Sequence, residues 1–370
     1  MPDLDTALKR KSKWYWYWLL FGVVMIFLRI GANSVPGIVE RIYSRGLFVG
    51  VRWMFDILFT WIPLPWVCLV VPAIVLYWIF AIRSWWQQPA GKNKWALMLL
   101  GPAAWISGGM GLFLLLWGFN YQRIPIEKQL GLEPVPLDSA QLAAELDTVT
   151  AWLVQARLAI PNIQQTDAGE PFLPADFMSK VRSAEQQWLL QNGFPAPGKV
   201  HVKPIWPKGL FLRFSSSGLY FPFTGEGYVD MGVHPLQRPF TLAHEMAHAH
   251  GFGDEGTCNF VGLMACLSSE DPYIRYSGLM GYWRYIAIGY RRMAPETYLA
   301  FREQLPAGII ADLEAISAYL DRYPDIMPHF RYITYDTYLK VQGISEGMLN
   351  YNRILVLGRA WRKKNKVLMR

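Results

Sequence analysis

The segment His244-Glu245-Met246-Ala247-His248 has the residue types and spacing to bind and use a metal ion. On an α-helix, residues four apart lie one turn above each other, so both imidazoles can reach one cation. Glu245 is then placed to take a proton from a metal-bound water. The competing interpretation is a helix that merely carries these side chains on its surface. The apolar neighbours Met246 and Ala247 disfavour it, because buried polar groups need partners. The pattern predicts a zinc (Zn²⁺) site.

A third ligand is expected close to this segment, because a catalytic zinc ion usually has three protein ligands and one position for water. If the run is read as HExxHxxGxxD, the ligand is Asp254. If one helix ends near Gly251 and the next begins after Asp254, the ligand is Glu255. We favour Glu255, because aspartate is a strong N-cap residue and would then stand behind the ligand. Asn259 lies one turn after Glu255 and could hydrogen-bond a ligand histidine.

The composition shows that the chain has chemically different parts. Of its 370 residues, 52% are hydrophobic and 17% are charged, whereas an ordinary soluble domain has roughly 25% charged residues. Twelve of the 17 tryptophans fall in the first 118 residues. The formal net charge of +8 belongs to the two ends, with +2 in residues 1–13 and +7 in residues 353–370. The nearly neutral body disfavours nucleic acid as a partner.

Three apolar stretches are long enough to cross the roughly 30 Å hydrocarbon core of a bilayer as helices. They cover about residues 14–31, 64–83 and 95–119. We therefore predict that residues 1–123 form a membrane anchor, with the lipid bilayer as a partner. Residues 42–62, between the first two spans, are amphipathic, which favours a helix lying at the membrane surface.

The orientation of the anchor follows from lysine and arginine near the span ends. The N-terminal tail and the loop over residues 83–94 are basic, whereas the other loop also contains Glu40 and Asp56. This bias favours a cytoplasmic N-terminus. Three spans then place everything after Arg123 on the extracytoplasmic side of the cell (inner) membrane. The first span is long and lacks a clean A-x-A site, which favours a retained anchor over a cleaved signal peptide.

Residues 124–352 have the composition of a globular domain, followed by a basic C-terminal tail at residues 353–370. Amphipathic patterns predict helices over residues 139–159 and 174–192, and nearly continuous helix from the HExxH segment onward. Residues 210–233 contain two short aromatic strands around a turn signal. The expected fold class is mostly α: three transmembrane helices and then a helix-rich α+β, zincin-like domain with a small β-hairpin or sheet.

Several short stretches match, in corresponding order, a family of predicted bacterial membrane-bound zinc metallopeptidases that is classed only as a domain of unknown function. They are residues 117–123, 224–226, 244–252, 259–260, 275–278 and 335–340. The chain resembles this family over most of its length. The resemblance implies a gluzincin-like site with His244 and His248 as ligands, Glu245 as base and a glutamate of the following helix as third ligand. Thr257 departs from the family pattern, because many relatives have a glutamate there.

The predicted function is a membrane-anchored zinc metallopeptidase that cleaves a peptide or protein substrate outside the cytoplasm, with Glu245 activating a zinc-bound water. The alternative is a non-catalytic membrane sensor or scaffold with a structural or vestigial zinc site. Tyr335 could stabilise an oxyanion, although packing within an aromatic-rich helix is the simpler interpretation. The strand near residues 219–223 could pair with an extended peptide, as in zincins. The pattern specifies neither a particular substrate nor an oligomeric state.

Overall fold

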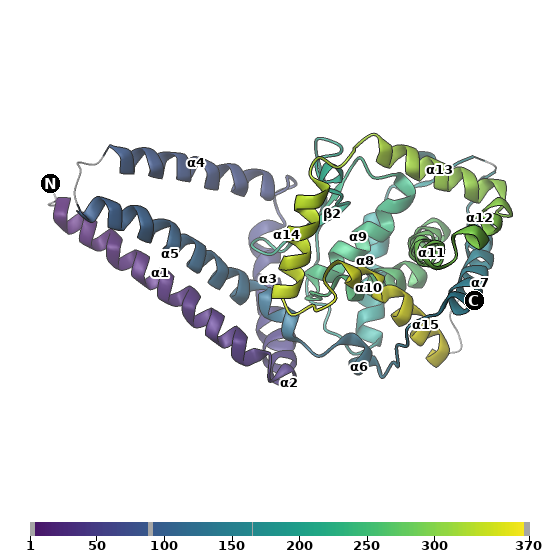
Figure 1. Ribbon diagram of the computed structural model, residues 1–370, viewed down its shortest axis with the longest axis horizontal. Helices are drawn as coiled ribbons and strands as arrows, with labels where there is room; N and C mark the ends of the chain where they lie inside the picture. Colours follow the sequence, from purple (N-terminus) through teal and green to yellow (C-terminus); the bar gives the residue numbers. More distant parts are fainter. Residues whose placement is uncertain (1–3, 88–91, 165, 366–370) are drawn as a thin grey trace. The chain divides into compact units, whose positions relative to one another are not determined.

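A computed structural model of the chain describes residues 4–87, 92–164 and 166–365 (Figure 1). The chain forms two compact units. Unit 1 comprises residues 1–123 together with Phe221–Thr224, and unit 2 comprises Ile124–Tyr220 and Gly225–Arg370. The described chain is mostly helical and contains a small three-stranded sheet, so the predicted combination of many helices and a small sheet is confirmed.

Within the described residues, unit 1 contains three helices that are long and apolar enough to cross a membrane, as the sequence predicted: α1 (Leu4–Ala32), α4 (Val67–Trp86) and α5 (Lys92–Leu116). Helices α1 and α5 run side by side (Figure 1). Glycines allow their close approach, because a Cβ at Gly108 would lie 1.9 Å from the ring of Trp18. Small residues at such contacts are the usual means by which membrane helices pack.

The segment between the first two apolar helices is also helical. It consists of α2 (Pro36–Ile38), a π-helical stretch (Val39–Leu47) and α3 (Phe48–Phe59). Its buried Glu40 accepts hydrogen bonds from Arg45 Nε at 2.8 Å and from Arg123 Nε at 2.9 Å. The two guanidinium groups balance the charge of the Glu40 carboxylate. Without them, burying this charge away from water would cost free energy. Arg123 follows a short 3-10 helix, Gly118–Gln122.

Unit 2 is built around one buried helix, α10 (Glu255–Ser268), in which every residue from Glu255 to Cys266 is buried. Helices α8, α9, α11 and α15 pack around it (Figure 1). These four helices span Phe177–Gln191 (α8), Arg238–Ala249 (α9), Pro272–Met293 (α11) and Arg353–Asn365 (α15). The remaining described helices of unit 2 are α6 (Ile126–Leu130), α7 (Ser139–Leu158), α12 (Pro295–Glu303), α13 (Ala307–Asp321) and α14 (Pro328–Val341). Short 3-10 turns lie at Glu170–Phe172, Leu212–Phe214, Pro235–Gln237 and Gly347–Asn352.

The sheet has the order β1-β3-β2. Strands β2 (Gly218–Phe221) and β3 (Glu226–Asp230) are the two that the sequence predicted. Strand β1 (Val202–Ile205) was not predicted, and it pairs in parallel with β3, with Val202 opposite Gly227. Pro204 makes this strand hard to recognise in the sequence, because proline lacks a backbone donor and is tolerated mainly in edge strands.

The basic C-terminal segment is not a separate tail, which corrects the predicted boundary at residue 353. Its described part forms α15, whose Ile354 and Leu357 are buried in the core of unit 2. Arg353 pairs with Glu127 and Asp254, at 2.7 Å in each case. Composition alone misses this, because it counts the charges without showing which face of the helix carries them. Residues 366–370, also assigned to the tail, lie outside the described residues.

A buried carboxylate joins separate segments of unit 2. Asp312 of α13 is completely buried and accepts hydrogen bonds from Arg157 Nε of α7 at 2.8 Å and from the backbone N–H of Ala168 at 2.6 Å. The hydroxyl of Tyr276 in α11 donates to the same carboxylate. Such a buried ion is tolerated only because several donors satisfy it.

Replacement of Asp312 by alanine should lower the free energy of unfolding by about 3–5 kcal/mol, because Arg157 would keep a buried charge without its partner. Asp321→Ala is the matched control, since Asp321 is exposed at the end of the same helix. It should change stability by less than about 0.5 kcal/mol. Thermal unfolding of the full chain in a mild detergent measures both variants. Equal unfolding midpoints would contradict the role assigned to Asp312.

Candidate metal centre

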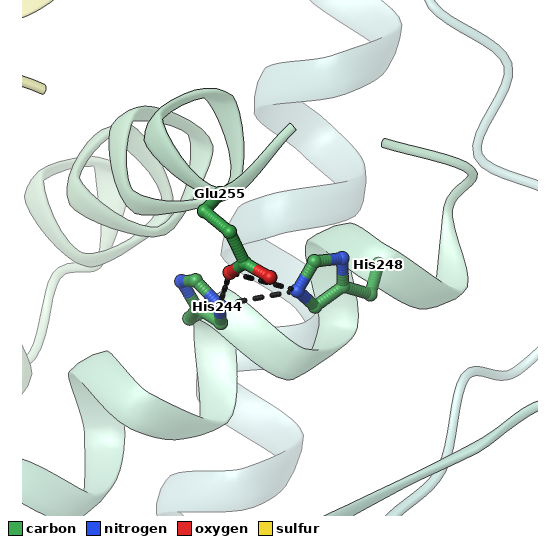
Figure 2. A group of neighbouring side chains, drawn as sticks. All are labelled: His244, His248 and Glu255. Atoms are coloured by element: carbon green, nitrogen blue, oxygen red, sulfur yellow. Dashed lines mark hydrogen bonds and ion pairs between the residues drawn. The ribbon is translucent and has the colours of Figure 1, made fainter. Parts of the chain in front are cut away.

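His244, His248 and Glu255 meet in unit 2, two of them from α9 and one from α10 (Figure 2). The two Nε2 atoms are 3.2 Å apart, and Glu255 Oε2 lies 3.1 Å from that of His244 and 3.4 Å from that of His248. In a tetrahedral site with zinc–ligand bonds of about 2.0–2.1 Å, ligand atoms lie about 3.3 Å apart. The three separations therefore fit one zinc-sized cation.

The turn after α9 explains why a glycine follows the second histidine. Gly251 has a φ of +83°, in the left-handed region that favours glycine. Its N–H donates to the carbonyl of His248 at 2.9 Å, and the N–H of Phe252 donates to that of Ala247 at 3.1 Å. This is a Schellman ending, which closes the helix and redirects the chain. Helix α10 can therefore begin within a few residues of the histidines.

The two acids at the start of α10 have different partners. Asp254 Oδ1 accepts a hydrogen bond from the backbone N–H of Thr257 at 2.6 Å, which makes Asp254 the N-cap. Its Oδ2 accepts from Asn350 Nδ2 and from Arg353, both at 2.7 Å. The carboxylate of Glu255 instead lies between the two imidazoles. The structure thus brings Glu255 into the cluster and holds Asp254 outside it.

Hydrogen bonds orient both imidazole rings. Nδ1 of His244 lies 2.9 Å from Oδ1 of Asn259, and Nδ1 of His248 lies 2.8 Å from the carbonyl oxygen of Phe252. The Asn259 amide is itself oriented, because its Nδ2 donates to the carbonyl of Tyr351 at 3.2 Å. Both acceptors favour a proton on Nδ1, which leaves a lone pair on each Nε2. Two such lone pairs facing each other would repel, so the pair needs a shared cation. A proton can serve, because against the effect of burial Cys258 and Glu255 raise the pKa of His248 well above its usual value, and a metal ion can take its place.

Glu245 lies beside the cluster and is buried. Burial raises its pKa to about 7, against the opposing effect of His244 and His248. Two glycines make room for it: a Cβ at Gly218 would lie 2.4 Å from Glu245 Oε1, and one at Gly227 would lie 2.9 Å from Glu245 Cβ. Neither glycine was singled out among the expected strands of residues 210–233. Glycine inside a strand pattern is the signal that could have identified both.

Glu255 is held by a tyrosine as well as by the histidines. Tyr335 of α14 donates a hydrogen bond to Glu255 Oε1 at 2.6 Å, and Tyr351 OH lies 3.3 Å from Tyr335 OH. Burial alone would raise the pKa of Glu255, but the imidazoles of His248 and His244 outweigh it and hold that pKa well below its usual value. Tyr335 thus reaches the centre, and its oxyanion role stays a prediction. Tyr351 carried no sequence signal that distinguished it.

Comparison with protein families matches residues 43–357 to a family described as "Protein of unknown function (DUF3810)". The chain belongs to this family. The match covers the whole cluster and most of both units, so the centre lies inside the part that DUF3810 proteins share. Comparison with curated proteins and with solved structures gave no match. The DUF3810 description states no activity.

The two acids can be distinguished by zinc binding to the purified full chain. If the cluster binds zinc through Glu255, Glu255→Gln removes a charged ligand and should weaken zinc affinity by more than the roughly 10–100-fold expected for the loss of an outer hydrogen-bond partner. Asp254→Asn, the matched control next to it, should retain most of the affinity. Competition with a chromophoric chelator measures both dissociation constants. A larger loss in the Asp254 variant would contradict the assignment.

Asn259 should affect zinc affinity through the orientation of His244. Asn259→Ala removes the acceptor for Nδ1 and should lower zinc affinity about 10–100-fold. Asn192→Ala is the control, because the Asn192 side chain follows α8 and donates to the carbonyl of Trp188 in the same helix at 2.8 Å. The same chelator competition applies. Equal affinities of the two variants would show that Asn259 does not act on the ligand.

Proposed function

We propose that the protein is a membrane-anchored zinc metallopeptidase that hydrolyses peptide bonds outside the cytoplasm. The observation that carries this proposal is the convergence of His244, His248 and Glu255, whose ligand atoms lie within 4.8 Å of one another, beside the buried carboxyl group of Glu245. Two imidazoles and one carboxylate are a donor set of catalytic zinc sites, whereas structural sites are usually rich in cysteine.

The number of ligands favours an enzyme over the scaffold alternative. Among the residues that the structure describes, the cluster has three histidine, cysteine or acidic members. Structural sites close the fourth position with a protein ligand, and catalytic sites leave it open. The nearby Cys258 does not close it, because its Sγ lies 3.2 Å from Nδ1 of His248, the nitrogen outside the cluster. Burial also raises the pKa of Cys258 to about 12, so it remains a thiol.

In this proposal a zinc ion held by the three residues would supply Lewis acidity and lower the pKa of a bound water to about 7. Glu245 accepts the proton of the attacking water at its carboxylate and later donates it to the leaving amine nitrogen. Burial raises the pKa of Glu245 and favours the later donation, whereas a cation beside it lowers that pKa and favours the initial acceptance. Asn259 and the Phe252 carbonyl keep the imidazoles oriented. The Tyr335 hydroxyl, which donates to Glu255 Oε1 at 2.6 Å, would stabilise a developing oxyanion by transferring this hydrogen bond to it.

The small sheet supports a zincin-like arrangement. Within the described sheet, β2 has β3 as its neighbour and forms an edge. Gly218 of β2 lies so close to Glu245 that a Cβ would meet its Oε1 at 2.4 Å. An extended peptide that paired with residues 218–220 would therefore run past Glu245, and backbone pairing would bind it with little dependence on its sequence.

The extracytoplasmic location is part of the same proposal. Its support is the distribution of lysine and arginine around three candidate spans, which favours a cytoplasmic N-terminus in the cell (inner) membrane. An odd number of spans then puts unit 2 on the opposite side. A hydrolase tethered there would meet peptide or protein substrates close to the bilayer.

The experiment uses the full chain in lipid nanodiscs, loaded with zinc and incubated with a degenerate library of synthetic peptides. Mass spectrometry identifies the products. Glu245→Gln should keep its zinc and lower the cleavage rate about 10²–10⁴-fold, because it removes the proton acceptor and leaves the ligands. Glu314→Gln, on the exposed face of α13, is the control and should cleave normally.

Two outcomes would contradict the proposal. Cleavage by the Glu245 variant at the wild-type rate would exclude the proton transfers assigned to that residue. Zinc bound in a wild-type protein that cleaves no peptide would favour the sensor or scaffold instead.

A further inference from the structure

Helix α14 carries Tyr335 to the metal centre, yet much of its remaining surface is exposed and apolar. Phe330, Ile333 and Val341 are 65%, 64% and 69% exposed. Their spacing of three and eight residues places them along one stripe of the helix. Leu339 is the buried residue of α14 in the described structure. The helix therefore contributes little to the core of unit 2 and presents large side chains outward.

The exposed surface continues into two loops that are bound to each other. The N–H of Ile326 donates to the carbonyl of Arg213 at 2.9 Å, and Ser215 Oγ donates to Asp325 Oδ2 at 2.5 Å. These bonds bring the loop over residues 206–216 next to the start of α14. We define the apolar patch as six side chains that are 40–65% exposed: Leu210, Phe214, Ile326, Met327, Phe330 and Ile333.

Basic residues border the apolar patch. The segments 206–216 and 322–334 contain the basic residues Lys208, Arg213, Arg322 and Arg331. Asp325 is the acid in these segments, and it pairs with Arg331 at 2.8 Å. Within these segments the four basic residues exceed the one acid by three, and the flanking Asp321 and Asp336 reduce this surplus. Apolar groups with a basic border are typical of surfaces that lie in a membrane interface and meet anionic headgroups.

We propose that the apolar patch lies in the interfacial region of the bilayer, with anionic lipid headgroups against its basic border. Large exposed apolar side chains on one helix and on the loops bonded next to it mark a binding partner. The chain itself indicates that the partner is lipid, because it contains three candidate spans and only residues 117–123 separate the end of α5 from unit 2. The proposal is independent of the peptidase proposal, since a scaffold could bind lipid equally. Through α14, the bilayer would also set the position of Tyr335.

The test uses nitroxide labels on the full chain in nanodiscs of phosphatidylcholine and phosphatidylglycerol, where both leaflets face solvent. Cys68→Ser removes the exposed thiol, and the completely buried Cys258 and Cys266 are not labelled. Single labels are placed at Ile333→Cys and Phe330→Cys. The control is Leu190→Cys on α8, because Leu190 is 63% exposed and lies outside the apolar patch.

Power saturation measures collisions of each label with oxygen, which concentrates in lipid, and with a water-soluble nickel chelate. At residues 330 and 333 the ratio of oxygen to nickel collisions should be several-fold higher than at residue 190. Ratios equal to that at residue 190 would overturn the proposal, because the apolar patch would then face water. An immobilised label with low access to both reagents would also overturn it, because protein would then cover the surface.

Nanodiscs of phosphatidylcholine alone test the basic border. Without anionic headgroups, the oxygen preference at residues 330 and 333 should decrease, because the surplus positive charge loses its partner. An unchanged ratio would overturn the headgroup contact.

Discussion

The packing of α10 against α9 is the constraint on which the candidate metal centre depends. The helices approach at the level of the backbone, because a Cβ at Gly262 would lie 3.1 Å from the backbone N of His244. Since α10 is buried over most of its length, the polar groups near its start need partners inside the protein. The imidazoles of α9 supply them for Glu255 and Asn259. A shift of either helix would leave buried polar groups unpaired, so the geometry of the centre and the stability of the core are coupled.

Two buried glutamates, ten residues apart, differ in chemistry because their surroundings differ. Glu255 lies between two imidazoles, which outweigh its burial and lower its pKa, so it remains an anion. For Glu245, the histidines offset burial less completely, so its pKa rises to about 7. A pair of acids whose environments move their pKa values apart is suited to separate roles, one as a permanent ligand and one as a proton carrier. In this chain the division is made by the position of each carboxyl group relative to Nε2 of the same histidines.

Exposed apolar side chains are expected in unit 1 but not in unit 2. In unit 1 they belong to helices that could face lipid, where an apolar surface is the satisfied state. In unit 2 most large side chains are buried around α7, α10 and α11. The apolar patch therefore requires an explanation there. Helix α14 exposes Phe330 to solvent and also carries Tyr335, which donates a hydrogen bond to Glu255. The apolar patch and the candidate metal centre are thus connected through one helix.

Much of the organisation was determined by the sequence alone, because it depends on local chemistry. An apolar run of about 20 residues predicts a span without tertiary information, and the four-residue spacing of His244 and His248 is a property of any helix. Gly251 and Asp254 likewise mark a helix end and a helix start. Only the tertiary structure shows which of the two acids lies with the histidines: Glu255 joins the cluster, whereas Arg353 and Asn350, nearly a hundred residues away, hold Asp254 outside it. It also decided the places of β1, Gly218 and α15, because their partners are distant in the chain and leave no local pattern.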